Sequence, residues 1–536
     1  MIAKIKDIDI DYRAPLFLDT ETIGLYGHIR LLQMYQTHWK EPMVLDSYEE
    51  DLDGVFEKLK HARIVCHNAS YDLTCLKKQF NFSAAVVDDT LYLARHKFLK
   101  LENYSLDRVA NACGFTGYTN LNKKELQKSN FSGLLSAEQY QYAEQDVLAL
   151  AYIWEYLKSL IDIPAYKLDI ISMLYAIEYQ ENGISVDTSL VEEELNATNE
   201  DIKKNEDQLG GLNVNSPKKC CEALNLTSTD ASSLKKAMVN NNLARLIFDQ
   251  RRLLKKRVLL KSYMYPKVYT VFNVAGAISG RYTAKGKDIT HGINSQQIPR
   301  YAKKYFYSTD PNTVTIEADY STLELRLAAT IFGCNKMRQQ LIDGLDLHTE
   351  VAKALLGVSE VSKEDRTKAK AVNFGFVYGM SSIKFKDYAF DNYGLELTEA
   401  EAYNWRTKYF ALYPEINAHH KYIWQHYKDN GFYVETAMGR KVSPKLGTDA
   451  INVPVQGSGA ECTKLAIKNL ISYNKDYIKY ITNVVHDSIK LEVPLHIKDS
   501  AIGDLKKAML VAWQELLQFS LCKFKDIPML VDVEVK

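Results

Sequence analysis

Four side chains recur at every fourth residue in one stretch of this chain: Arg366, Lys370, Phe374 and Tyr378. On an α-helix this spacing places two cations and then two aromatic rings along one face, over about 18 Å. A cationic pair can hold a polyphosphate, and aromatic rings can flank a sugar and a base. Gly379 follows, as the glycine that ends a helix does. The pattern predicts a helix that binds a phosphorylated ligand; the alternative is a core helix with a basic flank.

Aspartates stand at predicted strand ends on both sides of this helix. Residues 313–328 indicate a strand that runs into a helix, with Asp319 at the junction. Residues 481–494 indicate a β-hairpin with His486 and Asp487 at its tip. Two such aspartates can hold Mg²⁺ ions, which activate an attacking oxygen and stabilise a leaving one in phosphoryl transfer. Each aspartate taken alone also fits a turn residue or a helix cap.

A second set of acidic residues lies in the N-terminal third of the chain. Asp19 and Glu21 end an apolar, strand-like run, and residues two apart in a strand point to the same side. Asp72 stands where a predicted strand leads into a helix, and Tyr142 and Asp146 are one helical turn apart. The four carboxylates predict a two-metal site for phosphodiester hydrolysis, in which Tyr142 orients the attacking water. The alternative is a set of solvated acidic turns.

The segments around the central helix resemble motifs A, B and C of the family A DNA polymerases, the DNA polymerase I type, and occur in the family's order. Motif A corresponds to residues 319–326, motif B to residues 366–379 and motif C to residues 485–487. Further segments that resemble family elements are residues 279–281, 294–299, 346–348, 439–440 and 452–456. The resemblance covers most of the chain after its N-terminal third.

This resemblance implies roles at a nucleotide site. Asp319 and Asp487, helped by the backbone carbonyl of Tyr320, are expected to bind two catalytic Mg²⁺ ions. Glu324 is expected to act as a steric gate that fills the space of a ribose 2′-hydroxyl. Lys370 is the expected proton donor to pyrophosphate. The residues expected to grip the triphosphate are Arg366, Lys370 and His348.

The same resemblance implies contacts around the new base pair. Phe374 is expected to discriminate against dideoxynucleotides, because it lacks the hydroxyl that a tyrosine would offer, and Tyr378 to stack near the templating base. The residues expected to contact primer and template are Arg281, Asn294, Gln297, Arg440, Gln456 and His486. These contacts would lie largely in the minor groove, which presents similar acceptors on every base pair and so suits a check of pair shape.

The N-terminal carboxylates resemble those of the proofreading 3′-5′ exonucleases of the DEDD superfamily, in the subgroup with a tyrosine in its last motif. Asp19, Glu21, Asp72 and Asp146 match the four acidic positions, and Tyr142 matches the tyrosine. The resemblance implies two Mg²⁺ ions at each of the two active sites, with Mn²⁺ as a possible substitute. The neighbouring Asp88 and Asp89 are given no chemical role.

One residue departs from the family pattern. The family usually carries a glutamate after His-Asp, whereas this chain has Ser488, which cannot supply a negative charge. We expect synthesis to be retained, with an altered metal preference or rate. Two alternatives stay open: an exonuclease whose polymerase-like domain is weakly active or only binds DNA, and a single-subunit RNA polymerase. Glu324 argues against the RNA polymerase, since a ribonucleotide would clash with the gate.

The implied fold class is multidomain α/β and α+β, with a ribonuclease-H-like exonuclease domain followed by a right-hand polymerase domain. We expect the exonuclease domain at residues 1–163 and the polymerase domain at residues 164–536. Within the second domain, we expect the thumb at about 186–266, the palm at about 267–340 and 441–536, and the fingers at about 341–440. The expected partners are primer-template DNA, dNTPs and single-stranded 3′ ends, and we expect a monomer.

The composition fits this interpretation without revealing it. The 536 residues suffice for several domains, and 67 basic against 67 acidic residues leave no net charge from which to infer a nucleic-acid partner. The eight cysteines lack metal-binding spacing, which indicates free thiols in a reducing compartment. The sequence has no signal-peptide core and no run long enough to span a membrane. We therefore expect a cytoplasmic enzyme, in a host cytoplasm if the source is a bacteriophage, as the compact size suggests.

Overall fold

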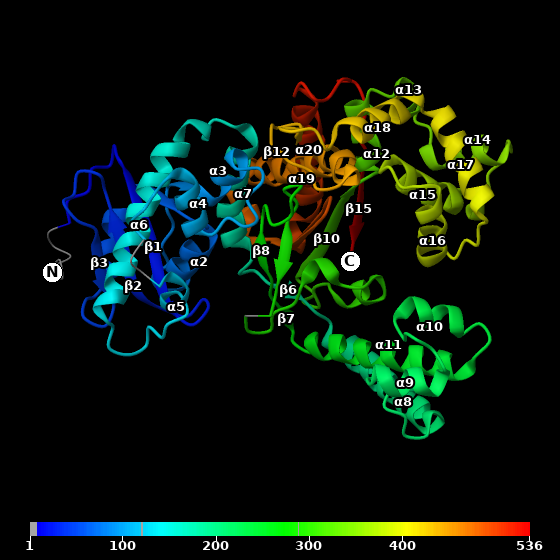
Figure 1. Cartoon of the computed structure of the whole chain (residues 1–536), viewed down its shortest axis with the longest axis horizontal. Helices are drawn as coiled ribbons and strands as arrows, with labels where there is room; N and C mark the ends of the chain where they lie inside the picture. The colour runs from blue at the N-terminus through cyan, green and yellow to red at the C-terminus, as the bar shows by residue number, and fades with distance from the viewer. Residues whose placement is uncertain (1–7, 119–121, 288) are drawn as a thin grey trace.

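The computed structural model describes residues 8–118, 122–287 and 289–536. A mixed sheet with its helices occupies the blue end of the chain, and a second sheet lies at the centre of the molecule (Figure 1). Two helical groups extend from the central region, one coloured green and one yellow (Figure 1). Among the described helices, none combines the length and the apolar character needed to cross a membrane.

The first region is built on a five-stranded sheet with the order β3-β2-β1-β4-β5. The pairs β1–β2 and β2–β3 are antiparallel, whereas β1–β4 and β4–β5 are parallel. This topology agrees with the expected ribonuclease-H-like domain. The strands are β1 (Pro15–Ile23), β2 (His28–Tyr35), β3 (Met43–Asp46), β4 (Arg63–Cys66) and β5 (Val86–Asp89).

Seven helices accompany this sheet. They are α1 (Asp53–Leu59), α2 (Ala69–Phe80), α3 (Thr90–Lys97), α4 (Leu106–Cys113), α5 (Lys123–Leu126), α6 (Ala137–Leu157) and α7 (Pro164–Tyr179). Ser136 and Gln139 form a capping box that fixes the start of α6. Because α6 packs against β1 and β2, its buried side chains Tyr142 and Asp146 face the strand that carries Asp19 and Glu21.

The central sheet has four antiparallel strands in the order β13-β14-β10-β15. These are β10 (Thr313–Tyr320), β13 (Ile481–Val485), β14 (Ser488–Pro494) and β15 (Val531–Val535). The long helices α19 (Gly447–Tyr473) and α20 (Lys498–Leu517) pack on each other and on this sheet. The predicted strand at Asp319 and the predicted hairpin with His486 and Asp487 at its tip are both confirmed.

The yellow helical group follows β10 in sequence (Figure 1). Its helices and those that connect it to the sheet are α12 (Leu323–Phe332), α13 (Asn335–Ile342), α14 (Leu347–Leu356), α15 (Lys363–Val377), α16 (Ser382–Tyr393), α17 (Glu399–Leu412) and α18 (Pro414–His426). Helix α15 is the predicted one with residues at every fourth position, and Gly379 follows it with φ of +75°, as a helix-ending glycine requires.

The green group projects from the central body (Figure 1). It consists of α8 (Thr188–Leu209), α9 (Pro217–Leu224), α10 (Ala231–Ala237) and α11 (Asn242–Ser262). It has an apolar core of its own, which includes Cys220, Leu234 and Ile247. Short strands complete the fold: β6 (Ile184–Ser185), β7 (Lys267–Val268), β8 (Val271–Asn273), β9 (Thr283–Lys285), β11 (Val434–Glu435) and β12 (Lys441–Val442).

A buried ion cluster joins α7 to α19 and to the segment around Arg440. Asp169 of α7 forms ion pairs with Arg440 and with Lys464 of α19, the second at 2.6 Å. Lys464 also donates to the backbone oxygen of Gly280 at 2.8 Å. Burial would raise the pKa of Asp169, but the two cations lower it below its usual range. The carboxylate is therefore charged and neutralised inside the protein.

Arg440, which the sequence analysis expects to contact DNA, is a member of this cluster. The Arg440 side chain is only 6% exposed, and its guanidinium is bound to Asp169. Gly280 has φ of +81°, and a side chain there would stand 2.4 Å from Nε of Arg440. Arg440 thus holds α7 in place, because an unpaired carboxylate at position 169 could not be buried.

We predict that Asp169→Asn strongly destabilises the protein, because it leaves Arg440 and Lys464 buried without their counter-charge. The expected loss in the free energy of unfolding is about 3–5 kcal/mol. The measurement is the unfolding midpoint in urea, followed by circular dichroism. The matched control is Asp162→Asn, which removes an exposed ion pair with Lys167 and should leave the midpoint close to that of wild type. Equal midpoints for the two variants would contradict the role given to the cluster.

Candidate functional sites

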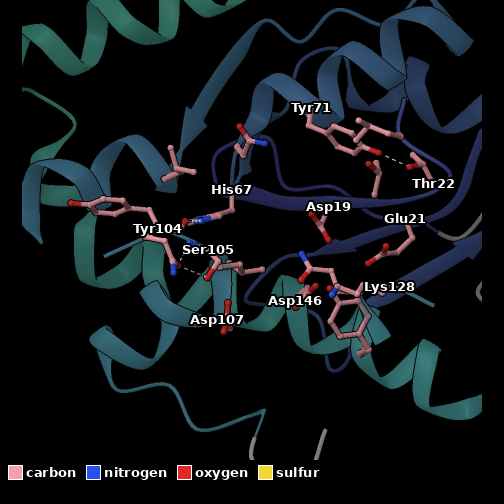
Figure 2. Close-up of a pocket in the computed structure, with 18 of the residues that line it drawn as sticks. Asp19, Glu21, Thr22, His67, Tyr71, Tyr104, Ser105, Asp107, Lys128 and Asp146 are labelled. Carbon is pink, nitrogen blue, oxygen red and sulfur yellow. Dashed lines mark hydrogen bonds between the residues drawn. The ribbon is translucent and has the colours of Figure 1, made fainter. Parts of the chain in front are cut away.

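The first candidate site is a group of three carboxylates in the N-terminal region. Asp19, Glu21 and Asp146 each offer an oxygen, and these oxygens all lie within 4.8 Å of one another. Figure 2 shows the three side chains around one cavity, which has a volume of about 900 Å³. Asp19 and Glu21 are two residues apart on β1 and so share one face of the strand. The sheet and α6 therefore bring together acidic residues that are far apart in sequence.

The sequence predicted four carboxylates at this site, and the structure places Asp72 outside the group of three. Thr20 lies between Asp19 and Glu21, so its side chain points to the other side of β1. Its hydroxyl donates to Asp72 Oδ1 at 2.6 Å. Asp72 is buried there, and this burial raises the pKa of its carboxyl to about 7. Asp72 contacts the strand that carries two of the acidic residues.

Two tyrosines lie beside Asp146. Tyr142 is buried, and burial together with Asp146, Glu21 and Asp19 raises its pKa far above the usual range, so the hydroxyl keeps its proton. Tyr118 donates to Asp146 Oδ1 at 2.5 Å. Sequence reasoning missed Tyr118, which lies between α4 and α5 with no regular spacing to reveal it.

The two neighbouring aspartates without a predicted role serve the fold. Asp89 accepts the backbone N–H groups of Asn68 and Ala69 at 3.0 and 2.9 Å, and so caps the start of α2. Asp88 accepts the Tyr166 hydroxyl at 2.8 Å and pairs with Arg63 at 2.7 Å. Both carboxylates are therefore occupied by structural contacts.

The second candidate site is formed by two adjacent strand ends of the central sheet. Asp319 of β10 is directly opposite Ser488, the first residue of β14. A two-residue turn of His486 and Asp487 joins β13 to β14, and His486 has φ of 55°, as tight hairpin turns require. Asp487 is thereby brought next to Asp319. Burial, followed by the charges of Asp487 and Glu317, raises the pKa of Asp319 to about 7.

A cavity of about 510 Å³ opens in front of these aspartates. Most residues predicted for nucleotide and metal binding line it, and they come from segments that are far apart in sequence. Those lining the cavity are Arg281, Asp319, Tyr320, Glu324, His348, Lys370, Phe374, Gln456, His486 and Asp487. Asn294, Gln297, Arg366, Tyr378 and Arg440 are outside this lining. The predicted site is thus assembled in large part, with five residues at its margin or away from it.

Glu324 is held from two sides. Arg281 Nη2 forms an ion pair with one of its carboxylate oxygens, and the Tyr378 hydroxyl donates to the other. Glu324 lies in the first turn of α12, the helix that follows Asp319 and Tyr320 at the end of β10. Its side chain lines the cavity. The two contacts fix the Glu324 side chain at the cavity wall.

His348 is an uncharged donor in this site. Burial, which outweighs the opposing effect of Asp346, lowers the pKa of His348 to about 4. Asn373 Nδ2 donates to His348 Nδ1 at 3.0 Å, which leaves the ring proton on Nε2. Arg366 forms an exposed ion pair with Asp346 at 2.7 Å. The two cations of the α15 stripe therefore differ: Lys370 lines the cavity, and Arg366 is bound at its edge.

Three other residues predicted to contact DNA are Asn294, Gln297 and His486. Asn294 caps the short helical turn at Ser295–Gln297 by accepting the backbone N–H of Gln296. Gln297 is exposed. Burial and the nearby Arg281 lower the pKa of His486. His486 lines the cavity, whereas Asn294 and Gln297 lie outside its lining.

Both sites suit a divalent cation with oxygen ligands. In each, carboxylates crowd together: three oxygens within 4.8 Å at the first site, and the neighbouring Asp319 and Asp487 at the second. Like charges so placed repel unless a cation or a proton lies between them. Hard cations such as Mg²⁺ prefer carboxylate and carbonyl oxygens, and no nitrogen or sulfur ligand stands in either group of acidic residues.

Comparison with known proteins identifies two family matches. The sequence model described as 3′-5′ exonuclease matches residues 1–162, and that described as DNA polymerase family A matches residues 187–536. DNA polymerase I of Aquifex aeolicus is 28% identical over 97% of this chain and 94% of its own length. DNA polymerase I of Caldicellulosiruptor bescii is 27% identical over 82% of this chain and 55% of its own length.

A solved structure shares the fold. The POL domain of Pol1 from M. smegmatis, in complex with DNA primer-template and dNTP, aligns with a TM-score of 0.76 and 19% sequence identity. The alignment covers 97% of this chain and 94% of that chain. With the family match over residues 187–536 and the exonuclease match ahead of it, this chain belongs to DNA polymerase family A and combines a DNA polymerase with a 3′-5′ exonuclease.

Proposed function

We propose that this chain extends a DNA primer with dNTPs at the Asp319–Asp487 pair and removes nucleotides from single-stranded 3′ ends at the Asp19–Glu21–Asp146 group. The observation that carries the proposal is the presence of two separate carboxylate centres, each in its own cavity. A polymerase that also hydrolyses mispaired ends needs both, because synthesis and hydrolysis require different attacking groups.

We infer that each centre takes Mg²⁺, two ions when the DNA is bound, with Mn²⁺ as a substitute. Asp319, Asp487 and the Tyr320 carbonyl supply the oxygen ligands at one centre, and Asp19, Glu21 and Asp146 at the other. Bound there, the cation lowers the pKa of an attacking hydroxyl or water and neutralises charge on the leaving oxygen. The raised pKa of Asp319 supports this, since the site is built for a charge of the opposite sign.

For synthesis, the side chains around the cavity bind and orient the triphosphate. Lys370 and the Nε2–H of His348 face the cavity and donate to phosphate oxygens, and Lys370 gives a proton to the departing pyrophosphate. Arg366 exchanges its exposed partner Asp346 for the triphosphate, which costs little because exposed ion pairs contribute under about 1 kcal/mol. The ring of Phe374 packs against the sugar.

Selection of the deoxy sugar rests on Glu324. Its carboxylate, fixed by Arg281 and Tyr378, occupies the space of a 2′-hydroxyl. A charged side chain that is fixed in place excludes the larger sugar more strictly than one that can rotate away. Tyr378 positions the gate and lies near the templating base.

For hydrolysis, Tyr142 keeps its proton and orients the attacking water, and Tyr118 holds Asp146 in place. We infer that Asp72 is a positioning residue that fixes Thr20, and through it the strand between Asp19 and Glu21. The DNA reaches the two centres from the side of Asn294, Gln297, Gln456 and His486. We assign the green helices to the thumb, the yellow group to the fingers and the central sheet to the palm.

We predict that Asp487→Ala abolishes synthesis and spares hydrolysis, and that Asp146→Ala does the reverse. Each change removes an oxygen ligand from one centre, so the affected rate should fall about a hundredfold or more. The measurement is the length of a labelled primer on a template, with and without dNTPs. Each variant controls for the folding of the other. Wild type that shortens but never extends the primer would favour the alternative, an exonuclease with a weakly active polymerase domain.

We predict that Glu324→Ala increases ribonucleotide incorporation. Removing the gate opens space for the 2′-hydroxyl, and the preference for dNTP over rNTP should fall roughly 10- to 100-fold. The measurement is the ratio of kcat/KM values for dCTP and CTP in single-nucleotide extension. Glu364→Ala is the control, since this glutamate is exposed and pairs only with lysine on its own helix. An unchanged ratio for Glu324→Ala would refute the gate assignment.

We predict that Asp72→Asn stabilises the metal-free protein more at pH 8 than at pH 4. The folded-state pKa of Asp72 is raised to about 7 from its ordinary value of 3.8, so the folded chain holds a proton that the unfolded chain releases. Stability is therefore lost as the pH rises between these values, and asparagine avoids the loss while still accepting from Thr20. The measurement is the thermal midpoint in EDTA across this pH range. The control is Asp9→Asn, an exposed change, and parallel curves for both variants would contradict the prediction.

A further inference from the structure

Four polar side chains form a square on one face of β10 and β14, next to Asp487. They are Glu317 and Asp319 on β10, and Ser488 and Lys490 on β14. Asp319 is directly opposite Ser488, and Glu317 is directly opposite Lys490. Residues two apart in a strand share a face, so Glu317 lies beside Asp319 and Lys490 beside Ser488. Glu317, Ser488 and Lys490 also line one small cavity, together with Lys303.

Glu317 contacts both β14 residues of this square, Ser488 diagonally and Lys490 directly across. The Ser488 hydroxyl donates to Glu317 Oε1 at 3.1 Å, and Lys490 Nζ is 3.3 Å from Glu317 Oε2. Lys303 approaches Oε1 at 3.6 Å from a side chain that is 55% exposed. Glu317 thus belongs to the strand that carries Asp319 and binds Ser488, the residue that follows Asp487.

This arrangement bears on the one departure from the family pattern. At position 488 the chain offers a hydroxyl where an acidic side chain was expected, and that hydroxyl binds a carboxylate from the neighbouring strand. The negative charge has not been lost from this part of the site, because Glu317 supplies it from β10. Lys490, which is 11% exposed, keeps the carboxylate in place from the other side.

We propose that Glu317 is a positioning residue for DNA synthesis, which takes over the place of an acidic side chain at position 488. Its carboxylate holds the ends of β10 and β14 together at the aspartate pair and keeps a negative charge beside the metal ligands. This inference rests on the proposed use of Asp319 and Asp487 in synthesis.

The test compares Glu317→Gln, Glu317→Ser, and the exchange variant Glu317→Ser with Ser488→Glu. Single-turnover dNTP incorporation is measured over a series of Mg²⁺ concentrations. Glu317→Gln and Glu317→Ser should lower kcat by about 10- to 100-fold and raise the Mg²⁺ requirement, because Glu317 binds Ser488, which follows Asp487, and lies beside Asp319 on β10. KM for the dNTP should stay near that of wild type, because Glu317 does not line the nucleotide cavity. The exchange variant should recover most of the lost rate.

Two controls separate this role from a structural one. Glu492→Gln changes a glutamate of β14 that likewise accepts from a serine, Ser185, at 2.7 Å, but lies opposite Thr315, away from the aspartates. It should leave synthesis unchanged. Hydrolysis of single-stranded DNA by every variant should equal that of wild type, which shows that the chain is folded.

The outcomes are distinct. Synthesis by Glu317→Gln at the wild-type rate and Mg²⁺ requirement overturns the inference and leaves the proposed function standing. An exchange variant no faster than Glu317→Ser overturns it as well, since the charge would then not be transferable between the strands. A wild-type chain that hydrolyses but does not synthesise fails the proposed function itself.

Discussion

The pairing register of β10 against β14 is the constraint on which the polymerase site depends. It sets Asp319 opposite Ser488, so the tight turn before Ser488 places Asp487 next to Asp319. A shift of one residue would turn Asp319 to the opposite face of the sheet and separate the two carboxylates. The buried apolar residues of β10, among them Ile316 and Ala318, hold this register because slippage would expose them.

The exonuclease site uses the same principle with a different third element. Alternation along β1 places Asp19 and Glu21 on one face, and the helix α6 brings Asp146 to them. In both sites the carboxylates stand closer than like charges tolerate in a partly buried setting. This repulsion lowers the stability of the protein when no cation is bound. The neutralised Asp169 cluster and the large apolar core, which stabilise the fold, lie elsewhere.

Charge near the polymerase site is arranged in neutral pairs. Glu324 is paired with Arg281, Arg366 with Asp346, and Glu317 with Lys490. The pairs differ in burial, and this sets which can open. The exposed Arg366 pair can exchange its partner at little cost, whereas the other two are more buried and fix side chains in place. A chain with no net charge can thus present a cationic edge to an incoming triphosphate.

Local pattern was enough to predict the elements that carry the chemistry. The spacing of Arg366, Lys370, Phe374 and Tyr378 predicted α15, and the polar pair between two apolar runs predicted the hairpin of Asp487. Helical and strand periodicities depend on neighbours in sequence, so they can be read from it. The sequence also predicted Asp19, Glu21, Asp72 and Asp146 as one site, from their spacing and their resemblance to a known arrangement, and the structure groups three of them, Asp19, Glu21 and Asp146.

Partners across the fold could not be read in this way. Arg440 is bound to Asp169, and Tyr378 is bound to Glu324. Each partner lies far away in sequence. Tyr118 and Glu317 had no signal at all, and Asp72 turned out to bind Thr20. By itself the sequence determined the helices, the strands and the acidic residues available for catalysis, because these follow from local spacing and residue type. Only the tertiary structure decided which side chains meet, because ion pairs and hydrogen bonds depend on distances that the folding of remote segments sets.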